Sequence, residues 1–98
     1  MRTIKLMADY QCFPLWEVSP EIVGNINPQD LPISSMLKQA LMMWAAKFDA
    51  TLNMDDPVSS GFGSERAANE FREEGDALAQ RLQEELGKNY VVVKNIKI

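Results

Sequence analysis

The chain has 98 residues, a formal net charge of −4 at pH 7, one cysteine and no histidine. This length fits a single domain, residues 1–98, with one hydrophobic core. The negative charge argues against sequence-independent binding of nucleic acid, whose phosphates favour clustered Lys and Arg. Because histidine is absent, the commonest general base is missing.

The first residues of the chain argue against a signal peptide. Arg2, Lys5 and Asp9 interrupt the unbroken apolar stretch that such a peptide needs. No other run approaches the roughly 18 to 20 apolar residues that span a bilayer. The single Cys12 can form no disulfide within the chain, which suits a reducing compartment. We therefore expect a cytoplasmic protein that has no membrane partner.

The first third of the chain predicts β-structure. Residues 2–9 alternate between two faces and predict a strand. Residues 10–20 are apolar and aromatic, but Pro14 lacks a backbone donor, so both an edge strand and an ordered loop stay open here. Residues 22–26 suggest a short strand, and the prolines in residues 27–32 predict a turn.

A first amphipathic helix is predicted over residues 35–52. Its apolar side chains recur at the i, i+3, i+4 and i+7 spacing of one buried face, and a serine at 34 or 35 can serve as N-cap. Trp44 lies on this face and is expected in the core. We expect Met36 to be buried as well, and we leave Met42 and Met43 open between core and contact surface.

A second helix is predicted from the N-cap Ser64 to the terminator Gly87. Phe62, just before the cap, can pack back onto this helix. Gly75 inside the helix would allow its backbone to approach the first helix or the sheet closely. The β-branched residues 90–98 then predict a strand with a buried first half.

These elements predict a fold of the α/β (α+β) class. The order is strand, strand, helix, helix, strand, and the expected architecture is a small two-layer sandwich. Two antiparallel helices would cover one face of a three-stranded mixed sheet, because the chain then returns in the direction of its first strand. The N-terminal strand would be central and parallel to the last one.

Carboxylates are the only plentiful titrating side chains. Asp49, Asp55 and Asp56 surround the loop between the helices. Loops carry binding residues often, because a rigid scaffold positions them. The alternative interpretation is that Asp55 and Asp56 only shape the turn beside Pro57.

A second acidic group lies on the predicted second helix and contains Glu70, Glu73, Glu74 and Asp76. Neither acidic group is required by the core pattern, so both are candidates for binding a basic protein surface. Trp16, in an irregular apolar segment, is either a core residue or an exposed anchor. We expect no metal, no cofactor and no catalytic residue, since paired carboxylates need a dry, shaped cleft for such chemistry.

Four segments carry a resemblance to a known group of proteins: residues 6–16 (LMADYQCFPLW), 24–28 (GNINP), 48–57 (FDATLNMDDP) and 60–62 (SGF). They resemble a group of small bacterial proteins, some of which are similar to immunity proteins of contact-dependent growth inhibition and other polymorphic toxin systems. The similarity covers most of the chain.

The resemblance implies a protein that binds and neutralises a cognate toxin domain, often a nuclease acting on tRNA or DNA. Such a protein would not be an enzyme and would not bind nucleic acid itself, and its acidic groups would face the basic nuclease. Two alternatives stay open from the residues. One is a cytosolic interaction or regulatory module that has no toxin partner, and the other is a small hydrolase-like enzyme that uses the carboxylates.

Overall fold

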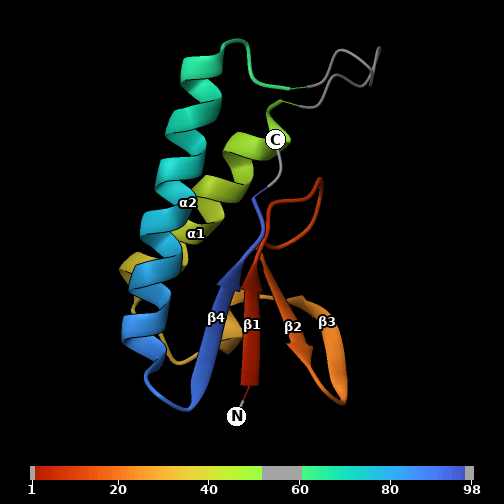
Figure 1. Cartoon of the computed structure of the whole chain (residues 1–98), viewed down its shortest axis with the longest axis vertical. Coiled ribbons are helices and arrows are strands. Elements are labelled where there is room, and N and C mark those ends of the chain that lie inside the picture. The colour runs from red at the N-terminus through yellow and green to blue at the C-terminus, as the bar shows by residue number, and fades with distance from the viewer. Residues whose placement is uncertain (1, 52–60, 97–98) are drawn as a thin grey trace.

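The computed structural model describes residues 2–51 and 61–96, in which two helices pack against a sheet (Figure 1). This is the expected mixture of helix and sheet. The elements are, in chain order, β1 (Arg2–Leu6), β2 (Leu15–Ser19), β3 (Ile22–Ile26), the short 3₁₀ helix η1 (Pro28–Asp30), α1 (Ser35–Asp49), α2 (Glu65–Leu86) and β4 (Tyr90–Lys94).

The sheet has four strands in the order β3-β2-β1-β4, so the expectation of three strands is wrong. The additional strand is β2, which is neither a loop nor an edge strand. Pro14 does not prevent it, because β2 begins at the next residue. The carbonyl of Pro14 still accepts a hydrogen bond from the Met7 N–H at 3.0 Å. As predicted, β1 lies inside the sheet and is parallel to β4.

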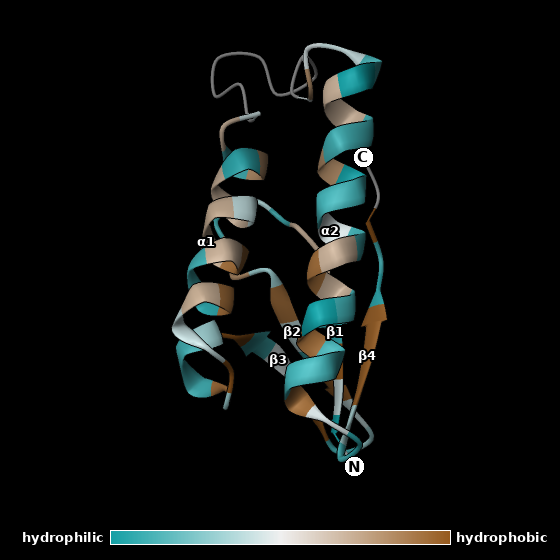
Figure 2. Cartoon of the chain, turned by 90° about the vertical axis from the view of Figure 1, so that its left-hand side faces the viewer, coloured by the Kyte–Doolittle hydropathy of each residue, from teal (hydrophilic) through white to brown (hydrophobic). Residues whose placement is uncertain are grey.

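Both helices begin at a serine that caps them. The Ser34 hydroxyl accepts the Leu37 N–H at 3.2 Å, and the Ser64 hydroxyl accepts the Ala67 N–H at 3.1 Å. α1 ends at Asp49, earlier than the expected residue 52, and α2 is followed by Gly87 at φ 80°. The helices run in opposite directions and cover the same face of the sheet, as Figures 1 and 2 show.

The hydrophobic core lies between the helices and this face of the sheet. It contains Ile4, Leu6, Leu15, Leu31, Leu37, Leu41, Trp44, Phe71, Leu78, Ala79, Leu82 and Leu86. The Trp44 ring stacks on Phe71 with centroids 4.4 Å apart, and its indole N–H donates to the Phe71 carbonyl at 3.0 Å. The position predicted for Trp44 is therefore confirmed. Phe62 packs against the Phe71 ring, also as predicted.

The predicted burial of Met36 and of the first half of the last strand is wrong. Met36 is 72% exposed, because the neighbouring Leu37 takes the buried position in the first turn of α1. Met42 and Met43 are also exposed. In β4, Val91 and Val93 are exposed because they alternate with Val92, which packs against the core, and so lie on the face of the sheet that the helices leave uncovered. Within residues 2–51 and 61–96, no helix is long and apolar enough to cross a membrane.

Candidate partner-binding surfaces

Three of the four carboxylates in the acidic group of α2 form ion pairs, each with a different element of the structure. Glu70 pairs with Arg66 of the same helix at 3.2 Å. Glu74 pairs with Lys47 of α1 at 2.7 Å, and Asp76 pairs with Lys94 of β4 at 2.7 Å. These ion pairs balance much of the negative charge of the group, and Glu73 is exposed.

Asp49 is the last residue of α1 and lies at a junction with the loop after β1. Its carboxylate accepts the Gln11 N–H at 2.9 Å, where Gln11 has φ 60°. The neighbouring Tyr10 ring stacks on Phe48 at 4.5 Å. Asp49 therefore helps to hold this loop against the end of α1. Asp55 and Asp56, the other members of the group, lie outside the described residues.

Trp16 lies on the uncovered face of the sheet and is half-buried. The register places it beside Lys5 of β1 and Asn25 of β3, and its indole N–H donates to the Met7 carbonyl at 3.1 Å. It is thus absent from the core cluster between helices and sheet. Its position leaves part of the ring available for contact with a partner.

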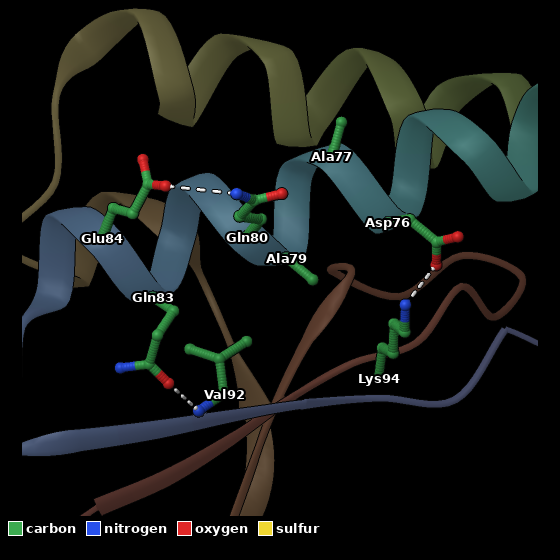
Figure 3. A pocket seen from close by; sticks show the side chains of 8 residues that line it. All are labelled: Asp76, Ala77, Ala79, Gln80, Gln83, Glu84, Val92 and Lys94. Carbon is green, nitrogen blue, oxygen red and sulfur yellow. Dashed lines mark hydrogen bonds and ion pairs between the residues drawn. The ribbon is translucent and has the colours of Figure 1, made fainter.

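A groove of about 570 Å³ lies between α2 and β4. Figure 3 shows the side chains of these two elements that line it. Asp76 and Lys94 form an ion pair at one end, and Ala79 and Val92 supply apolar surface in the middle. The side chains that line it are those of Asp76, Ala77, Ala79, Gln80, Gln83, Glu84, Val92 and Lys94. The groove is therefore amphipathic.

Gln83 closes part of the free edge of β4 from inside this groove. Its Oε1 accepts the Val92 N–H at 2.8 Å, and its Nε2 donates to the Tyr90 carbonyl at 2.8 Å. A single side-chain amide therefore takes the place of a neighbouring strand. Sequence reasoning missed this role, because the spacing of residues does not show which helix face meets a sheet edge.

Glu17 in β2 is a charged side chain that is only 3% exposed, on the helix-facing side of the sheet. Arg2 Nε donates to its carboxylate at 2.9 Å, and the Ser19 hydroxyl donates to it as well. The Arg2 guanidinium holds the pKa of Glu17 below the ordinary 4.5, although burial raises it. Glu17 is thus a paired, ionised group at neutral pH, which suits a structural role better than proton transfer.

The described residues contain no assembled metal site. In the ranges 2–51 and 61–96, no three His, Cys, Asp or Glu side chains lie close enough together to hold a metal ion. What the structure offers instead are surfaces: the groove at β4, the uncovered sheet face around Trp16, and the free edge of β3.

Comparison with known proteins identifies the family. No curated protein sequence matches the chain. The model of the Serratia CdiI immunity protein-like family matches residues 2–95, which is nearly the whole length. The resemblance noted in the sequence is thereby confirmed. The chain belongs to the Serratia CdiI immunity protein-like family, whose members are immunity proteins of contact-dependent growth inhibition.

Proposed function

We propose that this chain is a cytoplasmic immunity protein that binds the nuclease domain of a cognate toxin and blocks access of the substrate. The match to the immunity-protein family over residues 2–95 is the observation that carries the proposal. A protein with this role acts by binding and needs no catalytic group.

The charge of the chain supports a basic partner. Residues 6–37 contain four acidic residues and no Lys or Arg, and the other acidic residues are matched in number by the Lys and Arg of the chain. The whole net charge of −4 therefore comes from the segment around β2, β3 and η1. A nuclease domain presents positive charge to its substrate, so this segment is electrostatically complementary to it.

In this proposal the two acidic groups have a long-range role. Asp49, Asp55 and Asp56, together with the carboxylates of α2, add negative potential that raises the association rate with a basic toxin. Trp16 would supply an apolar contact on the uncovered sheet face. The ion pairs of Glu70, Glu74 and Asp76 reduce the net charge of their group and so limit this contribution.

Co-purification with the toxin domain encoded immediately upstream tests the proposal. We expect a stable complex, loss of nuclease activity on adding one equivalent of the chain, and survival of cells that express both proteins. If the chain neither binds this domain nor protects against it, the proposal is wrong, and a stand-alone interaction module becomes the better interpretation.

A second measurement tests the blocking of substrate. A labelled oligonucleotide bound to a catalytically inactive toxin domain should be displaced as the chain is added, with a fall in fluorescence anisotropy. If the chain abolishes nuclease activity while the oligonucleotide stays bound, inhibition occurs away from the substrate site.

A further inference from the structure

β3 is an edge strand whose outer backbone groups have no neighbouring strand. β2 and β3 are joined by the two-residue turn Pro20 and Glu21, and Ser19 is opposite Ile22. In such a hairpin the pair that flanks the turn exchanges hydrogen bonds, so Ile22, Gly24 and Ile26 direct their N–H and C=O groups toward β2. Those of Val23 and Asn25 consequently point away from the sheet.

The two edges of this sheet differ. At β4, Gln83 satisfies the Val92 N–H and the Tyr90 carbonyl. At β3, no hydrogen bond from the described residues reaches the outward N–H and C=O groups of Val23 and Asn25. Figure 1 shows β3 at the far side of the sheet from α2, with its outer edge uncovered.

β3 also lacks the features with which proteins protect an edge strand. Charged residues and prolines on an edge strand usually prevent its pairing with other chains. Residues 22–26 contain neither. Val23 is 82% exposed and Ile22 is 59% exposed, on opposite faces of the strand. A Cβ at Gly24 would meet no atom within 4 Å. This strand is therefore open along its outer edge, and at the end beside the turn its two faces are exposed as well, whereas Ile26 at the other end packs against the core.

The charge around β3 defines the chemistry of a partner. The exposed acidic residues near this part of the chain are Asp9, Glu21 and Asp30, and Glu17 is already paired with Arg2. A second copy of the chain would bring the same negative charge to the edge and be repelled. An extended segment that contains Lys or Arg would be attracted.

We propose that β3 binds a Lys- and Arg-containing extended segment of the cognate toxin domain, which adds to the sheet as a fifth strand. This rests on the proposed function, because it takes the toxin as the partner. The outward N–H and C=O groups of Val23 and Asn25 can form four hydrogen bonds with the added strand. The exposed Val23 side chain can pack against a side chain of that strand on the uncovered face of the sheet.

Val23→Pro tests the strand addition directly. Proline removes the outward N–H and places its ring where the partner strand must lie, while the hydrogen bonds of β3 to β2 come from other residues. We expect binding of the upstream-encoded toxin domain to weaken roughly tenfold or more. Val23→Thr keeps the N–H and a β-branched side chain, and should bind within about twofold of the parent.

Val23→Lys and its matched control Val91→Lys test whether the partner segment at β3 is basic, because an added positive charge would repel such a segment. Both valines are exposed on the uncovered face of the sheet, at its two opposite edges. We expect Val23→Lys to weaken toxin binding and to abolish protection, and Val91→Lys to bind like the parent. Circular dichroism and thermal unfolding establish that all variants keep the fold. Equal binding by Val23→Pro and the parent would overturn the proposal.

Amide hydrogen exchange of the unaltered chain gives a readout that does not depend on any variant. The Val23 and Asn25 amides should exchange quickly in the free protein and slowly in the complex. If the complex forms but these amides stay fast, the edge is not the site, while the proposed function stands. If no complex forms, both proposals fail. Sedimentation that shows a dimer of the free chain, lost in Val23→Pro, would assign the edge to self-association and overturn the inference.

Discussion

The side-chain amide of Gln83 in α2 pairs with the backbone of β4 as a neighbouring strand would, with its Oε1 2.8 Å from the Val92 N. The same side chain donates to the carbonyls of Tyr90 and Gly87. The helix thereby protects one edge of the sheet, whereas the edge at β3 stays open. The pairing of Gln83 thus makes the two edges of the sheet unequal in the backbone groups that they leave unpaired within the described residues.

Gln83→Leu should lower the free energy of unfolding by about 1 to 2 kcal/mol, because the half-buried Val92 N–H and Tyr90 carbonyl lose their partner. Urea unfolding measures this. Gln80→Leu is the matched control, since Gln80 lies on the same helix and its amide, within the part of the chain that the structure describes, bonds only the exposed Glu84, at 3.4 Å. If both variants lose the same free energy of unfolding, the hydrogen bonds from Gln83 to β4 do not themselves stabilise the protein.

Gly75→Ala should destabilise the protein although alanine is the better helix former. An added Cβ would lie 2.8 Å from Trp44 Cζ2 and 2.5 Å from Ile96 Cδ1. The Ile96 side chain can move, but the Trp44 ring is held by its stack on Phe71 and its hydrogen bond. Overpacking costs about 1 to 3 kcal/mol, against about 1 kcal/mol gained in helix propensity.

The control for this substitution is Gly63→Ala, where an added Cβ meets no atom within 4 Å. We expect its thermal midpoint to stay within a few degrees of the parent. A Gly75→Ala variant that is more stable than the parent would show that Trp44 moves aside, contrary to the close packing described above.

The helices of this protein could be predicted from sequence more fully than its sheet. Ser34 and Ser64 act locally as caps, and the buried spacing around Trp44 is regular, so both helices and the close approach at Gly75 follow from the sequence. β2 is harder to predict, because Pro14 conceals where the strand starts and strand pairing depends on residues far apart in the chain.

The surface was less predictable still, because it depends on which elements become neighbours. The carboxylates of α2 look like one group in the sequence, yet Lys47 and Lys94 come from other elements to pair with two of them. Likewise, nothing local marks Glu17 as paired with Arg2 across the sheet. The exposed edge at β3 follows from the strand order, which no local sequence pattern specifies.

Neutralising the acidic group of α2 should slow association with the toxin domain at low salt. The variant combines Glu70→Gln, Glu73→Gln, Glu74→Gln and Asp76→Asn. The difference from the parent should vanish at high salt, and the dissociation rate should not change, because exposed charges act mainly by steering. Stability should fall by no more than about 1 to 2 kcal/mol, since the ion pairs are exposed. Stopped-flow and surface binding kinetics measure both rates.

The matched control removes the same three ion pairs from the basic side, through Lys47→Gln, Arg66→Gln and Lys94→Gln. This variant becomes more acidic and should associate faster than the parent at low salt. If the neutralised α2 variant instead dissociates faster, those carboxylates contact the toxin directly, and α2 forms part of the interface.

Glu17 should make the stability of the protein sensitive to acid. Its pKa is lowered in the folded state, mainly by the hydrogen bond from Arg2, so the pair stabilises the fold above the ordinary pKa of 4.5. That contribution is lost as the pH falls through the lower, folded-state pKa. Glu17→Gln should therefore be less stable by about 1 to 2 kcal/mol at pH 7, since the Arg2 side chain is partly exposed and loses a charged hydrogen-bond partner. Its free energy of unfolding should also fall less steeply below pH 4.5.

Arg2→Gln separates the effect of the ion pair from that of burial. Without the guanidinium, burial still raises the pKa of the Glu17 carboxyl, and only the Ser19 hydroxyl opposes it. The pKa of Glu17 should consequently rise relative to the parent, and the acid-induced loss of stability should begin at higher pH. Carboxyl ¹³C chemical shifts recorded across the pH range measure this pKa in both proteins. An unchanged titration in Arg2→Gln would mean that the ion pair between β1 and β2 does not control the charge of Glu17.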